Sequence, residues 1–220
     1  IATTHAVKMI GAKVVLVDVQ PDLPIMEVAQ LEQKITPRTK AIIPVHLSGR
    51  PADMDSIREI AKAHGLLIIE DAAQALFSKY RGEYCGTQSD AGCFSFSVAK
   101  MLPMGQGGAI AIRSEEIYKQ LKQIRSHGVD DVINVTYARM GFNFRITDLQ
   151  SAIGLSQLAK VEQRLTSLNQ VYAKYESEMG RFPFLRFIPV NISQGEVPLY
   201  VEVLCKERHQ LVNFLTKYEI

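Results

Sequence analysis

Short runs of β-branched and other apolar residues recur along the first half of the chain, and stretches with helical spacing separate them. This alternation is typical of a parallel sheet whose strands are connected by helices. The runs are almost continuously apolar, which indicates strands buried on both faces. We therefore expect an α/β fold with a mostly parallel, mixed sheet flanked by helices, and strands at 13–18, 41–46, 66–70, 92–96 and 108–112.

Helix start signals lie between and after these runs. Asp53 or Asp55 can cap a first helix, and Ser114 precedes two glutamates that favour the start of a second. Thr147 and Gln150 have the spacing of a capping box, and apolar residues recur at helical intervals beyond them. Three helical regions are expected: 56–64, 114 to about 127, and 147 to about 179.

The pattern changes after Gly180, where aromatic residues and prolines cluster before a strand pattern at 199–204 and a helical pattern from about residue 206. We expect a large domain over 1–178 and the beginning of a small α+β domain over 179–220. The chain starts at Ile1 without an initiator methionine, and it stops at Ile220 inside an amphipathic pattern. We therefore expect truncation at both ends.

Charge and cysteine content exclude several classes of protein. The 25 basic and 23 acidic residues nearly balance, which argues against nucleic acid or an anionic membrane as the main partner. No apolar run reaches the roughly 20 residues of a transmembrane helix. The three cysteines lack C-x-x-C spacing, so neither a disulfide framework nor a metal site is expected. A reducing, cytoplasmic location fits this composition.

The octapeptide CFSFSVAK at 93–100 admits two kinds of chemistry. Counted from Ser97, it contains the S-x-x-K motif of serine acyl transferases. Counted from Lys100, it presents a lysine after a short strand, as in enzymes that capture carbonyl compounds as a Schiff base. The acyl-transfer reading also requires S-D-N and K-T-G elements; SDA at 89–91 precedes the serine, and K-T-G does not occur. Lys100 is therefore the preferred reactive residue, although an ordinary surface lysine is the simpler interpretation.

Partners for Lys100 strengthen the case. Asp71 ends an apolar strand pattern, at the sheet edge where open α/β folds bind ligands. A carboxylate there requires a cation, and the protonated ring nitrogen of pyridoxal phosphate is one; a helix N-cap is the alternative. Gln74 lies one turn further on, within reach of the same pocket or of solvent. The hydroxyls of Ser95 and Ser97 point to one side of the strand, where a hydroxyl beside the lysine can donate to a phosphate or be satisfied by backbone groups.

Taken together, several ordered motifs resemble the DegT/DnrJ family of pyridoxal-phosphate-dependent nucleotide-sugar aminotransferases. They are AIIPVHLSG at 41–49, EDAAQA at 70–75, SDAGCFSF at 89–96 with the lysine at 100, GG at 107–108 and GFNFRITDLQ at 141–150. The resemblance implies fold type I of the aspartate aminotransferase superfamily. It also implies that the cofactor is pyridoxal 5′-phosphate and that the protein is a homodimer with composite active sites.

By the same resemblance, each candidate residue receives a role. Lys100 would hold the cofactor and move protons, and Asp71 would pair with its ring nitrogen. Gln74 would lie beside the ring oxygen, Ser95 would donate to the phosphate, and Asn143 would reach the phosphate of the neighbouring subunit's cofactor. The implied reaction transfers an amino group, with L-glutamate as the expected donor, to a nucleotide-linked keto sugar. Such products serve polysaccharide, glycan or antibiotic sugar synthesis.

Two further functions stay open, a sugar dehydratase of the same family and a non-catalytic relative. The dehydratases carry histidine where the cofactor-binding lysine stands, so Lys100 favours transamination. Two departures from the common family pattern concern neighbouring residues. Members commonly have Thr-Lys-Asn where this chain has Ala99 to Met101, and His-Gly where it has Leu76 and Phe77.

Overall fold

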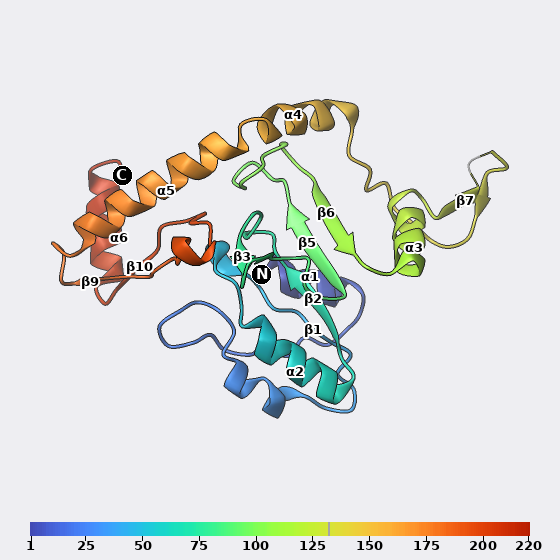
Figure 1. The fold of residues 1–220 in the computed structure, drawn as a ribbon, viewed down its shortest axis with the longest axis horizontal. Coiled ribbons are helices and arrows are strands. Elements are labelled where there is room, and N and C mark those ends of the chain that lie inside the picture. Colours follow the sequence, from blue (N-terminus) through green and yellow to red (C-terminus); the bar gives the residue numbers. More distant parts are fainter. Residues whose placement is uncertain (132) are drawn as a thin grey trace.

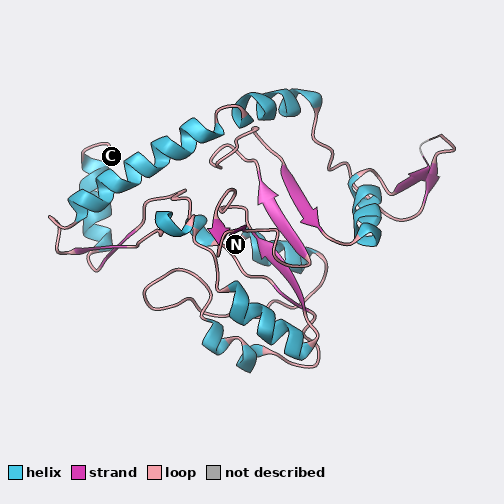
Figure 2. Ribbon diagram, viewed as in Figure 1, coloured by secondary structure: helices cyan, strands magenta, loops and turns pink. Residues whose placement is uncertain are grey.

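A computed structural model describes residues 1–131 and 133–220. Its centre is a four-stranded sheet in the order β1-β2-β5-β6, drawn in magenta in Figure 2. β1, β2 and β5 are parallel, and β6 is antiparallel to β5. The sheet is therefore mixed, as the sequence predicts. Its strands are β1 (Ala41–Ile42), β2 (Leu67–Asp71), β5 (Ala91–Ser95) and β6 (Gly108–Ile112).

The strand expected at 13–18 is absent. These residues pair with no other strand among those that the structure describes; the nearest ladder contact is an isolated bridge between Val19 and Met26. A strand requires a neighbour whose N–H and C=O groups face its own, and an apolar run does not supply one. The prediction of a strand here was wrong for this reason. Strand β1 is also shorter than expected, because Pro44 has no N–H to donate to a ladder.

The described residues include six α-helices. Asp53 caps α2, where its side chain accepts a hydrogen bond from the Ser56 backbone N–H. Thr147 and Gln150 form the expected capping box at the start of α4. The first helix was not expected, because no side chain caps it and its first turn has no acidic residue. The helices are α1 (Ala2–Met9), α2 (Met54–His64), α3 (Glu115–Arg125), α4 (Asp148–Leu158), α5 (Val161–Met179) and α6 (Arg208–Lys217).

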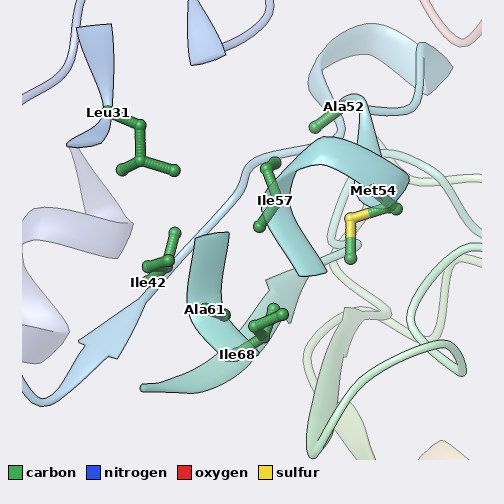
Figure 3. Packing of buried hydrophobic residues seen from close by; sticks show 7 residues of the cluster. All are labelled: Leu31, Ile42, Ala52, Met54, Ile57, Ala61 and Ile68. Carbon is green, nitrogen blue, oxygen red and sulfur yellow. The ribbon is translucent and has the colours of Figure 1, made fainter. Parts of the chain in front are cut away.

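The largest apolar core lies between α2 and the strands β1 and β2 (Figure 3). Ile57 and Ala61 are four positions apart on α2 and both are buried, so one face of the helix covers the sheet. Ile42 and Ile68 meet this face from the two strands. The core consists of Leu31, Ile42, Ala52, Met54, Ile57, Ala61 and Ile68.

Helices α4 and α5 follow one another in an extended arm that leads from the sheet toward the C-terminus (Figure 1). Short strand pairs lie around this frame: β3 (Lys79–Tyr80) with β4 (Glu83–Tyr84), β7 (Val129–Asp131) with β8 (Thr136–Tyr137), and β9 (Leu185–Phe187) with β10 (Val203–Cys205). The strand expected at 199–204 thus begins later. None of the helices among the described residues is long and apolar enough to cross a membrane.

Residues 188–202 return to the sheet domain through a buried arginine. Arg50 donates from Nε to the Pro189 carbonyl at 2.7 Å and from Nη2 to the Ile188 carbonyl at 3.0 Å, and it also pairs with Glu202. The backbone N–H of Val197 donates to the Ser78 hydroxyl at 3.0 Å. This C-terminal segment is therefore fixed to the loops that follow β1 and β2.

Phe77 has a left-handed backbone, with φ of 71°. A left-handed backbone costs an L-residue about 1–2 kcal/mol. At this position the family that the sequence resembles commonly carries glycine. We expect Phe77→Gly to be more stable than Phe77→Ala by about 1 kcal/mol, the reverse of the usual order of these residues. Both variants lose the same ring contacts, so urea unfolding of the pair isolates the backbone. Equal stabilities, or a more stable alanine variant, would contradict the strain.

Candidate active site

Asp71 is the last residue of β2, at the carboxyl end of the parallel strands. Its Oδ2 accepts a hydrogen bond from the Thr3 hydroxyl at 2.7 Å, and its Oδ1 accepts one from the Ala73 backbone N–H at 3.1 Å. Both donors are neutral, and Asp71 forms no ion pair among the described residues. The carboxylate is thus held in a fixed orientation while its charge is left without a cation.

Ser95 lies on the same face of the sheet as Asp71. Asp71 is in register with Cys93 of the neighbouring parallel strand, and Ser95 is two residues further along that strand. Side chains two apart on a strand share a face. The intervening Phe94 packs on the opposite face, against Ala72 and Cys85.

Cys93 lies on the same face, in register with Asp71 on the neighbouring strand. Burial raises the pKa of the Cys93 thiol, and the negative charge of Asp71 raises it further. The thiol therefore stays protonated and neutral at physiological pH.

Lys100 follows β5 in a tight turn, where its backbone N–H donates to the Ser97 carbonyl at 3.0 Å. The side chain is half-buried, and no hydrogen bond or ion pair of its ammonium group occurs among the described residues. The backbone on either side is anchored. Tyr200 donates to the Ala99 carbonyl at 3.4 Å, and Arg164 of α5 donates to the Met101 carbonyl at 3.0 Å.

The departure from the family pattern at Met101 has a structural explanation. Met101 is buried, with 3% of its surface exposed, and Leu102 beside it is buried too. Further along, Met104 packs directly against Gly154 of α4, where an added Cβ would lie 2.8 Å from the Met104 sulfur. Apolar packing therefore anchors the lysine turn to the helical arm.

Gln74 is held by the loop after β1. Its Oε1 accepts a hydrogen bond from the Ser48 backbone N–H at 2.8 Å. Ser48 itself has a left-handed backbone, with φ of 55°, which aims this N–H at the glutamine. The side chain is therefore positioned by protein contacts and is not simply solvated.

Asn143 lies apart from the other candidates, on the segment between α3 and α4. It is exposed, its Oδ1 accepts from Arg145 Nε at 3.0 Å, and its backbone forms an isolated bridge with Ser126. Among the described residues, no contact joins it to Asp71, Ser95 or Lys100. Its expected role on the neighbouring subunit's cofactor stays a prediction.

The elements that acyl transfer would need are engaged elsewhere. Asp90 accepts a hydrogen bond from the Ile68 backbone N–H at 2.8 Å, and the Ser89 hydroxyl donates to Glu70 at 2.8 Å. Both side chains stabilise the sheet, which leaves S-x-x-K without its second element.

Thr3 was not among the residues that the sequence indicated. It lies 68 positions before Asp71, and no motif connects the two. A second feature, the buried pair of His46 and Glu70, was also missed. The signal for it was a glutamate inside a buried strand, because a charged residue in such a place requires partners.

The donor set fits pyridoxal phosphate. Asp71 offers a negative charge for a protonated ring nitrogen, and Lys100 an amine for the aldehyde carbon. Ser95 and Gln74 add a hydroxyl and an amide at the same sheet edge. Within the described ranges, no group of three or more His, Cys, Asp or Glu could hold a metal ion.

Comparison with known proteins leads to the same family. The model of the DegT/DnrJ/EryC1/StrS aminotransferase family matches residues 1–220. The chain is 41% identical over 181 residues to GDP-perosamine synthase of Caulobacter vibrioides, covering 82% of this chain and 49% of that protein. The chain thus spans about half the length of this relative.

Solved structures agree. DesV of S. venezuelae, in complex with a ketimine intermediate, superimposes with a TM-score of 0.91 at 33% identity, over 99% of this chain and 58% of that one. A family aminotransferase from Brucella abortus gives 0.89 at 30% identity, over 100% and 60%. GDP-4-keto-6-deoxy-D-mannose-3-dehydratase of E. coli gives 0.87 at 26% identity, over 99% and 61%. The fold is that of fold-type I pyridoxal-phosphate-dependent transferases, and the chain belongs to the DegT/DnrJ/EryC1/StrS aminotransferase family.

Proposed function

We propose that the protein transfers an amino group from an amino acid, with L-glutamate as the expected donor, to a nucleotide-linked keto sugar, using pyridoxal 5′-phosphate. The observation that carries the proposal is the site at the carboxyl edge of β2 and β5. There Asp71 has no cationic partner among the described residues, and Lys100 lies in the turn that follows β5. The family match and the 41% identity to GDP-perosamine synthase support it.

Each side chain of the site has its own role in the proposed reaction. When bound, pyridoxal phosphate supplies an electron sink for the carbanion that forms when the amino acid loses its α-proton. Lys100 holds the cofactor and moves this proton. Asp71 keeps the ring nitrogen protonated, with Thr3 fixing the orientation of its carboxylate. Ser95 donates to the phosphate, and Gln74 lies beside the ring oxygen.

A homodimer with composite sites is part of the proposal. Asn143 is flanked by exposed apolar side chains, at 45% exposure for Phe142 and 64% for Phe144. Leu149 and Leu155 of α4 are exposed at 80% and 70%. Clustered apolar surface of this kind favours burial against a second protein surface. The partner's Asn143 would then complete the phosphate site.

Three finer expectations belong to the same proposal. The protein acts in the cytoplasm, and its product enters polysaccharide, glycan or antibiotic sugar synthesis. The chain divides near residue 178 into a large cofactor-binding domain and the beginning of a small domain.

Dehydration of the sugar is the second candidate, because dehydratases occur among the similar structures. An assay with GDP-4-keto-6-deoxymannose and L-glutamate separates the two reactions. Transamination yields an amino sugar nucleotide and 2-oxoglutarate, whereas dehydration removes a ring hydroxyl. Mass spectrometry of the nucleotide distinguishes these products. If no keto-sugar nucleotide from a broader panel is converted by the cofactor-loaded protein, the proposed function is wrong.

A further inference from the structure

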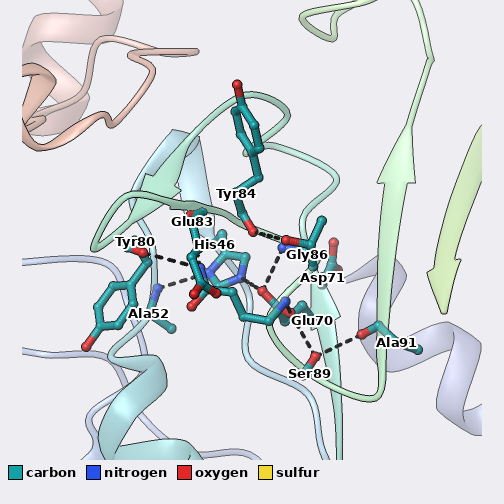
Figure 4. A network of polar contacts seen from close by, with 12 residues as sticks. His46, Ala52, Glu70, Asp71, Tyr80, Glu83, Tyr84, Gly86, Ser89 and Ala91 are labelled. Atoms are coloured by element: carbon teal, nitrogen blue, oxygen red, sulfur yellow. Dashed lines mark hydrogen bonds and ion pairs between the residues drawn. The ribbon is translucent and has the colours of Figure 1, made fainter. Parts of the chain in front are cut away.

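His46 and Glu70 form a buried polar pair on the side of β2 that faces away from Asp71. Both side chains are 0% exposed, and His46 Nε2 lies 3.0 Å from Glu70 Oε2 (Figure 4). Glu70 and Asp71 are adjacent in the strand, so their side chains point to opposite faces. The pair therefore supports the site from behind without belonging to it.

The direction of the hydrogen bonds made by the His46 ring and by the backbone N–H groups of this network is fixed. The Ala52 backbone N–H donates to His46 Nδ1 at 3.0 Å, so the ring proton lies on Nε2 and is donated to Glu70. Glu70 also accepts from the backbone N–H groups of Gly86 at 2.6 Å and Gln88 at 2.8 Å, and from the Ser89 hydroxyl. Burial raises the pKa of Glu70, but these hydrogen bonds outweigh it, and the pKa lies below its usual range.

The network joins three separate segments at the end of β2. The His46 backbone N–H donates to the Asp71 carbonyl at 3.0 Å, and the Asp71 N–H donates to the Pro44 carbonyl at 2.9 Å. Two residues after His46, Ser48 holds the Gln74 side chain. The histidine thus lies between the backbone contacts of Asp71 and the contact that orients Gln74.

A buried carboxylate and its partner contribute little net stability compared with well-packed apolar side chains. The pair instead fixes the orientation of the segments, because its hydrogen bonds can form in only one arrangement of the chain. We propose that His46 and Glu70 are positioning residues, which fix the end of β2 and the 46–49 turn so that Asp71 and Gln74 face pyridoxal phosphate. This inference rests on the proposed function.

Glu70→Gln tests the direction of the bonds at almost unchanged volume. The new amide must place its NH₂ toward either His46 and Gly86 or Gln88 and Ser89, and on each side it meets a backbone N–H donor. The His46 ring cannot compensate by moving its proton to Nδ1, because the Ala52 N–H faces that atom. A buried donor is therefore left without an acceptor in every arrangement, and the segments must shift.

The experiment titrates pyridoxal phosphate by absorbance into the purified cofactor-free protein at its natural length. Glu70→Gln is expected to weaken affinity by about 10–100-fold, by analogy with residues that orient the ligands of a metal ion. The control is Ile57→Val, in the core between α2 and the sheet, which lowers stability while leaving every hydrogen-bonding group of the network in place. Urea unfolding of the cofactor-free proteins shows how far each variant is destabilised, and Ile57→Val is expected to retain wild-type affinity.

A second pair of variants keeps the test decisive if Glu70→Gln does not fold. His46→Gln retains a donor for Glu70, whereas His46→Leu removes it, so His46→Gln is expected to bind the cofactor at least about 10-fold more tightly. Equal affinities for these two variants, or for Glu70→Gln and wild type, would overturn the positioning role while leaving the proposed function intact. Failure of the wild-type protein itself to bind pyridoxal phosphate would instead overturn the proposed function.

Discussion

Lys100→Ala is expected to reduce turnover by at least about 10³-fold, because one side chain both holds the cofactor and moves the proton in each half-reaction. Proton transfer by a positioned side chain alone contributes about 10²–10⁴-fold. The ammonium group makes no hydrogen bond or ion pair among the described residues, so its removal orphans no partner. We therefore expect the unfolding free energy to stay close to that of the wild type. Steady-state kinetics with L-glutamate and a keto-sugar nucleotide measure the loss.

Ser97→Ala is the matched control, three positions earlier in the same turn. The Ser97 carbonyl that accepts from Lys100 belongs to the backbone and survives the substitution. Among the described residues, its hydroxyl makes one hydrogen bond, in which it accepts weakly from the Ser95 hydroxyl at 3.4 Å. Most activity should remain. The opposite ranking, an inactive serine variant beside an active lysine variant, would restore the acyl-transfer interpretation.

Asp71→Asn is expected to lower turnover by about 10–1000-fold while leaving the fold intact. An adjacent opposite charge shifts a pKa by about 1–3 units, so loss of the carboxylate depletes the protonated ring nitrogen by that factor. The amide suits the surroundings of the side chain. Its oxygen can accept from the Ala73 N–H, and its NH₂ can donate to the Thr3 hydroxyl, which is able to accept.

Thermal unfolding separates this effect from misfolding. The melting temperatures of the cofactor-free variant and wild type should agree, and pH titration of the bound cofactor's absorbance should show the ring nitrogen titrating at lower pH. An Asp71→Asn protein with wild-type turnover would show that Asp71 serves only to accept the Ala73 N–H, as in the simpler helix-cap interpretation.

The elements predicted correctly are those whose signals are local. Strand β6 has the expected bounds, because an apolar run leaves a glycine turn and ends at charged residues. Asp53, one of the two expected caps, precedes α2 as its N-cap, and the expected capping box of Thr147 and Gln150 precedes α4. The segment 13–18 has an equally good strand composition, yet it can form a strand only if another strand lies beside it. Pairing partners are a tertiary property that composition does not contain.

The residues of the site also differ in how far they could be predicted from the sequence. Asp71 and Ser95 lie together because the ends of neighbouring parallel strands meet at one sheet edge, which strand order alone implies. The hydroxyl of Thr3 reaches Asp71 across 68 positions, and His46 reaches Glu70 across 24. Such contacts depend on how α1 and the 46–52 loop pack, so they emerged only with the three-dimensional structure.

Borohydride reduction of the cofactor-loaded protein tests the central claim most directly. Reduction makes the bond between pyridoxal phosphate and its lysine permanent, and peptide mass spectrometry then locates the modified residue. We expect the label on Lys100 alone, in the peptide that contains CFSFSVAK, and its loss in Lys100→Ala. A label on any other lysine, or none at all in protein saturated with cofactor, would contradict the account.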